Sequence, residues 1–505
     1  MGAPYNATVD VLERNLAHPD RVALRDAGRS VTYGELCERA NRAGNALLAL
    51  GGTMEQRVLL FLLDSADFVA CFWGAIKAGL VPVPVNTLLT AADVDYMLRD
   101  SRARVLVVSE PLLEKLAPIL RGQPFLKHVV VQGKGKQLDD LLAAASPRLE
   151  AAPTTTDDVA FWLYSSGSTG TPKGAMHLQQ DLVQTARTYG AGVLKLRPDD
   201  VVFSAAKLFF AYGLGNAMTF PFAVGATVAL LEGRPTPESV MRILREERPT
   251  VFYGVPTLFA AILADPSNGR ASGSDRLRIC VSAGEPLPKE IGERWRDRFG
   301  ADILDGIGST EMLHIFLSLR EDDIRYGTTG KPVPGYDLRI VDETGRDVPA
   351  GEIGELLVRG PSSAVAYWNQ REKSLRTFQG PWTYTGDKYR CDPEGYYVYC
   401  GRSDDMIKAS GQWVSPAEVE SALVAHPSVL EAAVVAHKDE NQLDKPQAFV
   451  VLKPGARATA DELQRFVKER LAPFKYPRWV EFLDALPKTA TGKIQRFKLR
   501  QTPPA

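Results

Sequence analysis

The chain has 505 residues, of which 45% are apolar and 24% are charged, the balance of a globular protein rather than a disordered, collagen-like or coiled-coil one. Lysine and arginine number 60 and aspartate and glutamate 61, so the formal net charge is −1 and general binding of nucleic acid or of anionic membrane is not expected. Five scattered cysteines form no Cys-x-x-Cys pair, which argues against a disulfide framework or a zinc site. Together with a first segment that lacks an apolar signal core, this predicts a cytoplasmic protein.

The first 150 or so residues alternate strand and helix patterns, as expected for parallel β/α layers. Val58–Leu63 and Val105–Ser109 are predicted to be buried strands. Asp64–Gly79, between them, is predicted to be a helix.

The segment from Leu208 to Leu231 carries no charged residue and is long enough for a membrane-spanning helix. Its glycines and Pro221 favour a different interpretation: a buried helix that ends near Ala223, a turn at Gly225 and a short strand at Ala226–Leu231. No membrane partner is therefore predicted.

The centre of the chain repeats one theme, a short apolar run followed by a loop rich in Gly, Ser or Asp. The four runs are Phe161–Tyr164, Val251–Tyr253, Leu277–Val281 and Ile303–Leu304. In open parallel sheets ligands bind beyond the carboxyl ends of the strands, so four such exits predict one large, nucleotide-sized site.

After Gly330 the pattern becomes β-rich, and the polar turn 401–405 marks a domain boundary. We predict a large domain over residues 1–402 and a small α+β domain over 403–505, in which helices begin after capping residues Ser415 and Thr459. Arg465–Arg500 holds ten Lys/Arg against three Asp/Glu, which suits either an anionic ligand or a solvated face.

The most informative stretch is Tyr164–Gly174, with the sequence YSSGSTGTPKG. Its small residues supply backbone N–H groups and hydroxyls and Lys173 adds a cation, a combination that binds a polyphosphate. It is not a Walker A loop, because the lysine precedes glycine instead of a Ser or Thr that opens a helix. A flexible Gly/Ser spacer is disfavoured by the apolar run before it.

This stretch resembles the phosphate loop of the adenylate-forming superfamily, which comprises acyl- and aryl-CoA ligases, peptide-synthetase adenylation domains and luciferases. Five further segments resemble the family's motifs in the same order, namely SAGEP (282–286), DGIGSTE (305–311), YTGD (384–387), GRSDD (401–405) and LPKTATGK (486–493). The resemblance implies a large α/β domain with a β-rich subdomain and a small, mobile C-terminal domain.

The resemblance also implies the residues that handle ATP. Lys493 would bridge the acid's carboxylate and the α-phosphate, Thr310 would contact phosphate and Glu311 would bind Mg²⁺. Asp387 would accept hydrogen bonds from the ribose hydroxyls and Arg402 would add a ribose or phosphate contact. The remaining expected ATP/AMP-binding residues are Ser165, Ser166, Gly167, Ser168, Thr169, Gly170, Lys173, Ala283, Gly284, Glu285, Pro286, Asp305, Gly306 and Ile307.

A pivot is expected at Asp404, because adenylation needs Lys493 in the site whereas thioester formation needs a channel for the pantetheine arm of CoA. The loop after it, with Lys408, Ser410, Gly411 and Trp413, is expected near that channel.

The stretch KLFFAYGLGN (207–216), together with 308–316, resembles benzoate-CoA ligases and their hydroxybenzoate relatives, and its flat aromatic side chains suit a ring. The residues expected to line the acid pocket are Ala206, Phe210, Tyr212, Gly308, His314 and Ile315. His314 would orient the carboxylate or is an interior histidine, and Gln179 stands where many relatives have a second histidine, which leaves His177 without a role.

The expected activity is therefore that of an AMP-forming aryl-CoA ligase, which converts benzoate, ATP and CoA to benzoyl-CoA, AMP and diphosphate through benzoyl-AMP. A hydroxybenzoate- or aminobenzoate-CoA ligase, an enzyme that loads a carrier protein and a non-catalytic nucleotide-binding protein are the alternatives. The expected partners are a small aromatic carboxylic acid, ATP and CoA, with Mg²⁺ as cofactor and a monomer or homodimer as the assembly.

Overall fold

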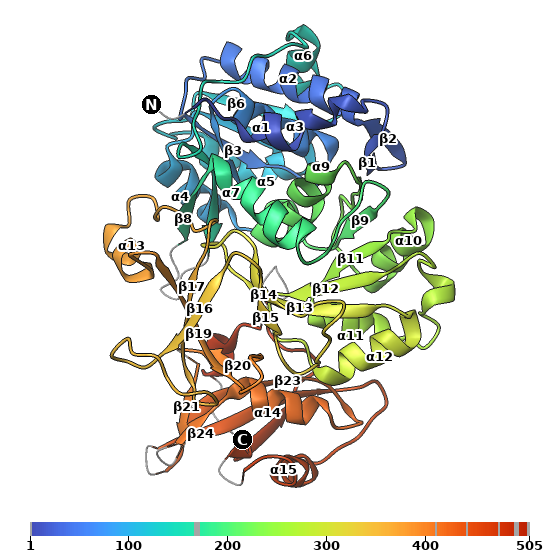
Figure 1. The fold of residues 1–505 in the computed structure, drawn as a ribbon, viewed down its shortest axis with the longest axis vertical. Helices are drawn as coiled ribbons and strands as arrows, with labels where there is room; N and C mark the ends of the chain where they lie inside the picture. The colour runs from blue at the N-terminus through green and yellow to red at the C-terminus, as the bar shows by residue number, and fades with distance from the viewer. Residues whose placement is uncertain are drawn as a thin grey trace.

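The computed structural model describes residues 3–165, 172–403, 405–409, 412–440, 443–472, 475–488 and 494–501. The chain runs from parallel β/α layers at the top of Figure 1, through an antiparallel β-rich region, to a small α+β unit at the bottom. This is the predicted fold class, a large N-terminal α/β part followed by a smaller C-terminal part.

The largest sheet has nine strands. In order across the sheet they are β15 (Lys331–Pro332), β14 (Ile315–Ser318), β13 (Asp302–Gly308), β12 (Ile279–Ala283), β11 (Val251–Gly254), β9 (Val201–Ser204), β10 (Thr227–Ala229), β1 (Val22–Asp26) and β2 (Arg29–Thr32). The strands from β13 to β1 are parallel, and antiparallel strands close both edges. Their carboxyl ends therefore share one side of the sheet, where a ligand site is expected.

A second sheet is parallel throughout, in the order β4 (Val81–Pro84), β3 (Arg57–Phe61), β5 (Val105–Ser109) and β6 (His128–Gln132). The helix α3 (Ala66–Lys77) begins after Ser65, whose hydroxyl accepts the Phe68 N–H. Since residues 68–77 of this helix are all buried, α3 lies inside the layers rather than on their surface. The predicted strands and helix of this region are confirmed to within about three residues at each end.

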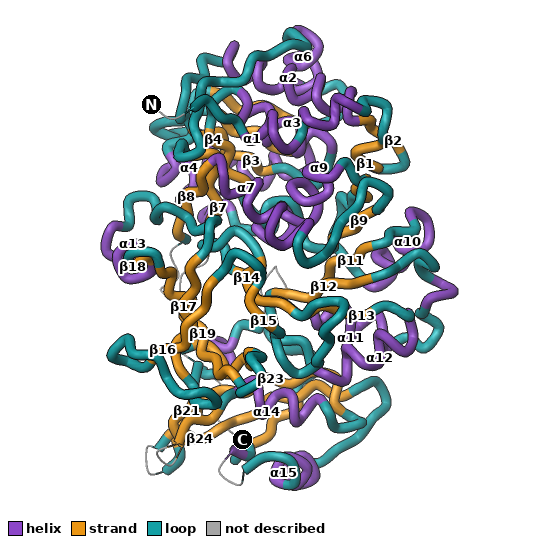
Figure 2. The backbone as a smooth tube through the Cα atoms, in the orientation of Figure 1, coloured by secondary structure: helices purple, strands orange, loops and turns teal. Residues whose placement is uncertain are grey.

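The other helices of the large part lie mostly on the faces of these sheets (Figure 2). They are α1 (Ala7–Val11), α2 (Tyr33–Ala49), α4 (Ala91–Ser101), α5 (Glu110–Leu120), α6 (Gln137–Ala144), α7 (Gln179–Thr185), α10 (Pro237–Glu247), α11 (Pro256–Ala264), α12 (Lys289–Phe299) and α13 (Arg371–Thr377). Within the described ranges, no helix combines the length and the apolarity needed to cross a membrane.

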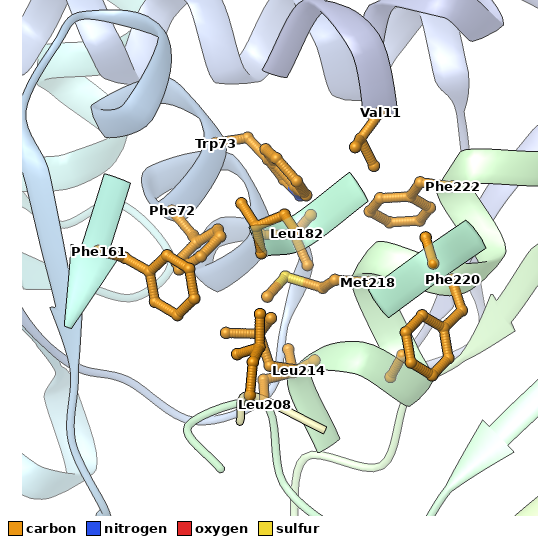
Figure 3. Packing of buried hydrophobic residues seen from close by; sticks show 14 of the residues in the cluster. Val11, Phe72, Trp73, Phe161, Leu182, Leu208, Leu214, Met218, Phe220 and Phe222 are labelled. Carbon is orange, nitrogen blue, oxygen red and sulfur yellow. The ribbon is translucent and has the colours of Figure 1, made fainter. Parts of the chain in front are cut away.

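The uncharged segment 208–231 is a buried, broken helix. It consists of α8 (Ala211–Leu214), a π-helical turn (Gly215–Thr219) and α9 (Phe220–Val224), and ends at Gly225, where φ is +78°. The strand that follows, β10, is shorter than predicted. Figure 3 shows Leu208, Leu214, Met218 and Phe220 of this segment packed in one apolar core with Phe161 and Leu182.

The first of the four predicted exits differs from the other three. β7 (Val159–Ser165) pairs antiparallel with β8 (Lys173–Leu178) in a two-stranded sheet beside β4. A parallel return needs a crossover of a dozen or more residues, and the connection from β7 to β8 is shorter than that. The parallel arrangement on which that prediction rests is therefore present for β11, β12 and β13 and not for β7, and the single nucleotide site stays a prediction.

The β-rich region is an antiparallel sheet of β16 (Asp337–Val341), β17 (Gly354–Arg359), β19 (Trp382–Cys391), β18 (Phe378–Gln379) and β20 (Tyr397–Arg402). The C-terminal unit contains β21 (Ile407–Ala409), β22 (Gln412–Val414), α14 (Pro416–Val424), β23 (Val429–Lys438), β24 (Asp444–Leu452), α15 (Ala460–Lys468), β25 (Trp479–Phe482) and α16 (Arg496–Leu499). Ser415 and Thr459 cap α14 and α15 as predicted, although the reciprocal bond of a full capping box forms only at Thr459.

Candidate active site

The β7–β8 hairpin brings the two ends of the predicted phosphate loop together. Ser165 and Lys173 are direct partners across the two strands. Ser166, Gly167, Ser168, Thr169 and Gly170 lie outside the described residues. Ser165 and Lys173 therefore fix where the loop starts and where it ends.

Four side chains meet at the end of this hairpin, and we refer to Ser165, Lys173, Glu311 and Tyr367 as the Glu311 cluster. The Glu311 carboxylate accepts hydrogen bonds from Tyr367 Oη at 2.7 Å and from Ser165 Oγ at 3.2 Å. Lys173 Nζ lies 3.6 Å from Glu311 Oε1 and donates to Tyr367 Oη at 2.9 Å. The cluster joins β7, β8, the turn after β13 and the segment before α13.

The electrostatics of the cluster keep Glu311 ionised. Burial raises the pKa of Glu311, but Lys173 and the hydrogen bonds from Tyr367 and Ser165 outweigh it and hold the pKa below its usual value. Burial lowers the pKa of Lys173, and the Glu311 charge opposes that shift. A hydrogen bond to a charged group contributes about 1.5–3 kcal/mol to stability, so Tyr367 contributes substantially to holding the Glu311 cluster together.

The two strands expected to contact adenine lie side by side. Ala283 pairs with Gly306 at the carboxyl ends of β12 and β13, and Ile307 follows on β13. Asp305 is 5% exposed, and burial raises its pKa to about 8 although backbone N–H groups of Leu287 and Gly306 act in the opposite direction. Gly284, with φ of +94°, turns the chain away after β12 toward Glu285 and Pro286.

Asp387 and Arg402 are paired across β19 and β20. Arg402 Nη1 donates to Asp387 Oδ1 at 2.9 Å and to the Thr385 carbonyl at 3.1 Å. Gly386 lies between these acceptors at φ +74°, a conformation that favours glycine, and a Cβ there would be 2.8 Å from Arg402 Nη2 and would displace the guanidinium. The charges of Asp387 and Glu311 both raise the pKa of Arg402, against the effect of its partial desolvation, although half of its side chain is exposed. Arg402 therefore interacts electrostatically both with Asp387 and with the Glu311 cluster.

The C-terminal segment contacts the site through Glu285. Lys493 lies outside the described residues, but the N–H of Ile494, the next residue, donates to Glu285 Oε1 at 3.1 Å. Arg496 binds both oxygens of Glu420 on α14 at 2.8 Å, which fixes the same segment to the C-terminal unit. The residues that directly follow Lys493 thus belong to a segment that lies against the loop after β12.

Part of the predicted hinge and CoA channel is not tested. Asp404, Ser410 and Gly411 lie outside the described residues, whereas the backbones of Lys408 and Trp413 pair across β21 and β22.

Several of the residues predicted to line the acid pocket lie around a buried histidine, His314. We refer to Tyr189, Tyr212, Asn216, Phe220 and His314 as the His314 cluster, in which the three other rings lie 4.4–5.6 Å from the imidazole centroid. Gly308 and Ile315 are partners across β13 and β14 and flank this histidine, and Ala206 and Phe210 lie just before α8. A Cβ at Gly215 would lie 2.4 Å from His314 Cδ2, so the close approach requires glycine.

The hydrogen bonds of His314 favour the interior-histidine interpretation. Its Nε2 faces two acceptors, Asn216 Oδ1 at 3.1 Å and the Tyr212 carbonyl at 3.3 Å, so Nε2 carries a hydrogen. Burial lowers the pKa of His314 to about 3, which keeps the ring neutral, and Nδ1 has no partner. A neutral Nδ1 without a hydrogen accepts hydrogen bonds, as in an interior histidine, and the role of His314 in orienting the acid stays a prediction.

Sequence reasoning missed Tyr367, which bridges Lys173 and Glu311. It lies in the segment AVAYWN, where neither spacing nor composition distinguishes it from a core aromatic residue. It also left His177 unassigned, yet the Nε2 of His177 lies 2.7 Å from the carbonyl of Thr310.

The Glu311 cluster also fits a magnesium ion. Among the described residues no group of three or more His, Cys, Asp or Glu side chains forms a closed metal cage. Mg²⁺ does not need one, because it commonly binds one or two carboxylates and takes its other ligands from phosphates and water. Glu311, ionised beside the phosphate hairpin, is such a carboxylate.

Comparison with known proteins agrees with this arrangement. The family model described as AMP-binding enzyme matches residues 12–368, and that of the AMP-binding enzyme C-terminal domain matches 418–493. The chain is 58% identical to a benzoate–CoA ligase of Thauera aromatica over 98% of this chain and 96% of that protein. It is 50% identical to a 4-hydroxybenzoate–CoA/benzoate–CoA ligase of Rhodopseudomonas palustris over 98% and 94% of the two chains.

The fold comparison gives the same result. A crystal structure of a benzoate CoA ligase from Burkholderia xenovorans LB400 superposes with a TM-score of 0.93 at 52% identity, covering 98% of this chain and 100% of that one. With both family domains matched and identities above half over nearly the whole length, the chain belongs to the AMP-binding enzyme family, the adenylate-forming superfamily.

Proposed function

We propose that this chain is an AMP-forming aryl-acid–CoA ligase with benzoate as its acid. One observation carries the proposal: Glu311, partly buried and ionised, and the Lys173 cation lie together at the phosphate hairpin. Glu311 is three residues along the chain from His314, which is enclosed by aromatic rings. Relatives that are 58% and 50% identical carry benzoate in their names, which supports the choice of acid.

In the first half-reaction a benzoate oxygen attacks the α-phosphorus of ATP, the bond to the β-phosphate oxygen breaks, and diphosphate leaves. Both reactants are anions, so fixed cations lower the barrier most effectively in a site that excludes water. In this proposal Lys173 holds the phosphates, Tyr367 keeps Lys173 and Glu311 in place, and Lys493 bridges the carboxylate and the α-phosphate. Magnesium, held by Glu311, would spread the negative charge of the leaving group.

In this proposal the nucleotide is oriented by residues from five strands (β7, β12, β13, β19 and β20) and from the loops that follow them. Asp387 accepts the ribose hydroxyls, with Arg402 beside it. Ala283, Gly284, Glu285, Pro286, Asp305, Gly306 and Ile307 form the adenine side, while Thr310 and Ser165 contact phosphate with the loop 166–170. Carboxylate acceptors suit two hydroxyl donors better than neutral groups do.

In the second half-reaction the CoA thiol loses its proton, its sulfur attacks the acyl carbon, and AMP leaves with the bridging oxygen. Lys493 must withdraw to admit the pantetheine arm. We place the pivot at Asp404, at the boundary of domains 1–402 and 403–505, with Lys408, Ser410, Gly411 and Trp413 near the channel. The hydrogen bond from Ile494 to Glu285 fits the adenylating arrangement, and thioester formation would require it to break.

An assay with benzoate, ATP, Mg²⁺ and CoA tests the proposal. Benzoyl-CoA and AMP are expected in equal amounts, and ADP in place of AMP would reject the mechanism. A carrier-protein loading enzyme would need a phosphopantetheinyl carrier instead of free CoA, so omitting one acceptor at a time separates the two.

The identity of the acid is tested next, because the similar protein of R. palustris is named for both 4-hydroxybenzoate and benzoate. One hydroxyl in an apolar pocket changes selectivity by about 1–3 kcal/mol. A panel of hydroxy-, amino- and halobenzoates, ranked by kcat/KM, identifies the preferred ring. A reducing, cytoplasmic location is part of the proposal and rests on the cysteines, all five of which are free.

A further inference from the structure

Two buried side chains that the proposed mechanism leaves unused lie directly behind the catalytic turn. His177, on β8, and Asp181, in the first turn of α7, are 0% and 1% exposed. Asp181 Oδ2 lies 3.0 Å from His177 Nδ1 and also accepts the N–H of Leu178 at 3.0 Å. On its other side His177 Nε2 lies 2.7 Å from the carbonyl oxygen of Thr310.

The position of one hydrogen follows from these partners. The Thr310 carbonyl has no hydrogen to give, so a contact of 2.7 Å requires that Nε2 carries one and donates it. The second hydrogen of the pair lies between Nδ1 and Asp181, either on the ring or on the carboxyl. In both arrangements Asp181 occupies Nδ1 and leaves Nε2 as the donor to Thr310.

The turn that accepts this hydrogen bond is strained. The Thr310 carbonyl also accepts the N–H of Leu313 at 3.2 Å, which closes a turn over residues 310–313. Leu313 has φ of +64°, an uncommon conformation for a residue with a side chain. Such a residue costs about 1–3 kcal/mol and persists only where its surroundings hold it.

The strand β8 connects the turn to the phosphate hairpin. Lys173 and His177 are four residues apart on β8, so their side chains leave the same face of the strand. Phe161, the partner of His177 on β7, stacks on the imidazole with centroids 5.2 Å apart and an interplanar angle of 18°. The ring therefore has little freedom to rotate away from Thr310.

We propose that His177 is a positioning residue for the adenylation step: held by Asp181 and Phe161, it donates from Nε2 to the Thr310 carbonyl and so fixes the strained turn that presents Thr310 and Glu311 to ATP. The inference rests on the proposed function for the step it serves. It predicts that loss of the donor impairs adenylation and leaves thioester formation nearly unchanged, because the second half-reaction does not use the diphosphate side of the site.

Two substitutions at the same position separate positioning from packing. His177→Gln retains an amide N–H that can donate in place of Nε2–H, whereas His177→Leu has no donor. Both remove the ring and its stacking on Phe161. Asp200→Asn is the matched control, because Asp200 is also a buried ion-paired aspartate, 2.9 Å from Arg278, at the opposite end of the parallel strands.

The readout is the rate of benzoyl-AMP formation compared with the rate of thioester formation from supplied benzoyl-AMP, each corrected for the folded fraction. His177→Leu is expected to lower the first rate about 10- to 100-fold, the range seen when a hydrogen-bond partner behind a ligand-binding group is lost. His177→Gln is expected to retain about tenfold more adenylation activity than His177→Leu. Equal losses in the two variants, or equal losses in both half-reactions, would overturn the inference.

A second measurement does not depend on activity. In protein labelled with ¹⁵N-histidine, the His177 signals are those that disappear in His177→Gln, and a directly bonded hydrogen is expected at Nε2. An Nε2 without hydrogen contradicts the inference even where His177→Leu does not fold. If the parent protein forms no benzoyl-AMP, the proposed function fails while this measurement still reports on the hydrogen bond.

Discussion

The Glu311 cluster and the His314 cluster are joined by residues 311–314, yet they are held together in different ways. Lys173, Glu311 and Tyr367 are fixed by hydrogen bonds of 2.7 and 2.9 Å to the Tyr367 hydroxyl and by an ion pair of 3.6 Å between Lys173 and Glu311. His314 is fixed by surrounding rings and by a glycine that leaves no room for a methyl group. The first arrangement is suited to stabilising charge that changes during reaction, and the second to enclosing a ring of fixed shape.

The largest expected effect concerns Lys493, the cation proposed to act beside the Glu311 cluster. Lys493→Ala is expected to lower benzoyl-AMP formation about 10²- to 10³-fold, since it removes a fixed charge that stabilises the transition state. Diphosphate exchange into ATP measures this step. The matched control, Lys498→Ala in the same basic segment, is expected to behave like the parent, and an equal loss in thioester formation from supplied benzoyl-AMP would contradict the role of Lys493.

The next effect concerns the residue that the sequence did not reveal. Tyr367→Phe removes the hydroxyl that bridges Lys173 and Glu311 and leaves the ring in place. A lost hydrogen bond to a charged group corresponds to about 10- to 100-fold in adenylation rate. The rate is measured at saturating ATP and benzoate, with Tyr326→Phe, whose hydroxyl binds Asp302 outside the site at 2.8 Å, as the control. A rate within twofold of the parent shows that Lys173 and Glu311 hold each other unaided.

The packing of the His314 cluster is tested by adding a single methyl group. In Gly215→Ala the new Cβ would clash with the His314 ring, and overpacking of this kind destabilises by about 1–3 kcal/mol. Thermal unfolding and kcat/KM for benzoate are both expected to fall. Gly233→Ala, where a Cβ meets nothing within 4 Å, should change neither property. An unchanged kcat/KM in Gly215→Ala would place the ring pocket elsewhere.

The smallest effect is a pH dependence at Asp305, whose charge also raises the pKa of Tyr189 and of Tyr212 in the His314 cluster. Its pKa is raised from 3.8 to about 8 on folding, so the folded state binds more protons than the unfolded one between these values. Its contribution to stability is therefore complete below about pH 4 and is lost as the pH rises toward about 8.

Asp305→Asn removes this dependence, because the amide stays neutral. The variant is expected to unfold at a higher temperature than the parent at pH 8 and at a similar temperature at pH 4. Thermal melts at the two pH values measure the difference, and a parallel shift at both would show that Asp305 is ionised in the folded protein.

Much of the fold and of the charged side was predictable from sequence. The strand-to-loop segments at β11, β12 and β13, and the assignment of Lys173 and Glu311 to the handling of ATP, follow from short motifs in the sequence. What escaped prediction depends on contacts between distant segments. Tyr367 meets Lys173 across almost two hundred residues, and the antiparallel return of β7 is set by the length of its loop. The state of His314 depends on burial and on Asn216, which no local pattern records.

The strand β8 has a consequence for how the enzyme tolerates insertions and deletions. Side chains alternate along a strand, and each residue advances it by about 3.3 Å. Lys173 and His177 are therefore held at a fixed separation, with their side chains on the same face of β8. One residue inserted between them would move one of the two side chains to the opposite face of β8 and separate the hairpin from the turn at Thr310. A change in length outside residues 173–177 would leave that spacing intact, but the loop before Lys173 is constrained separately by its proposed contacts with phosphate.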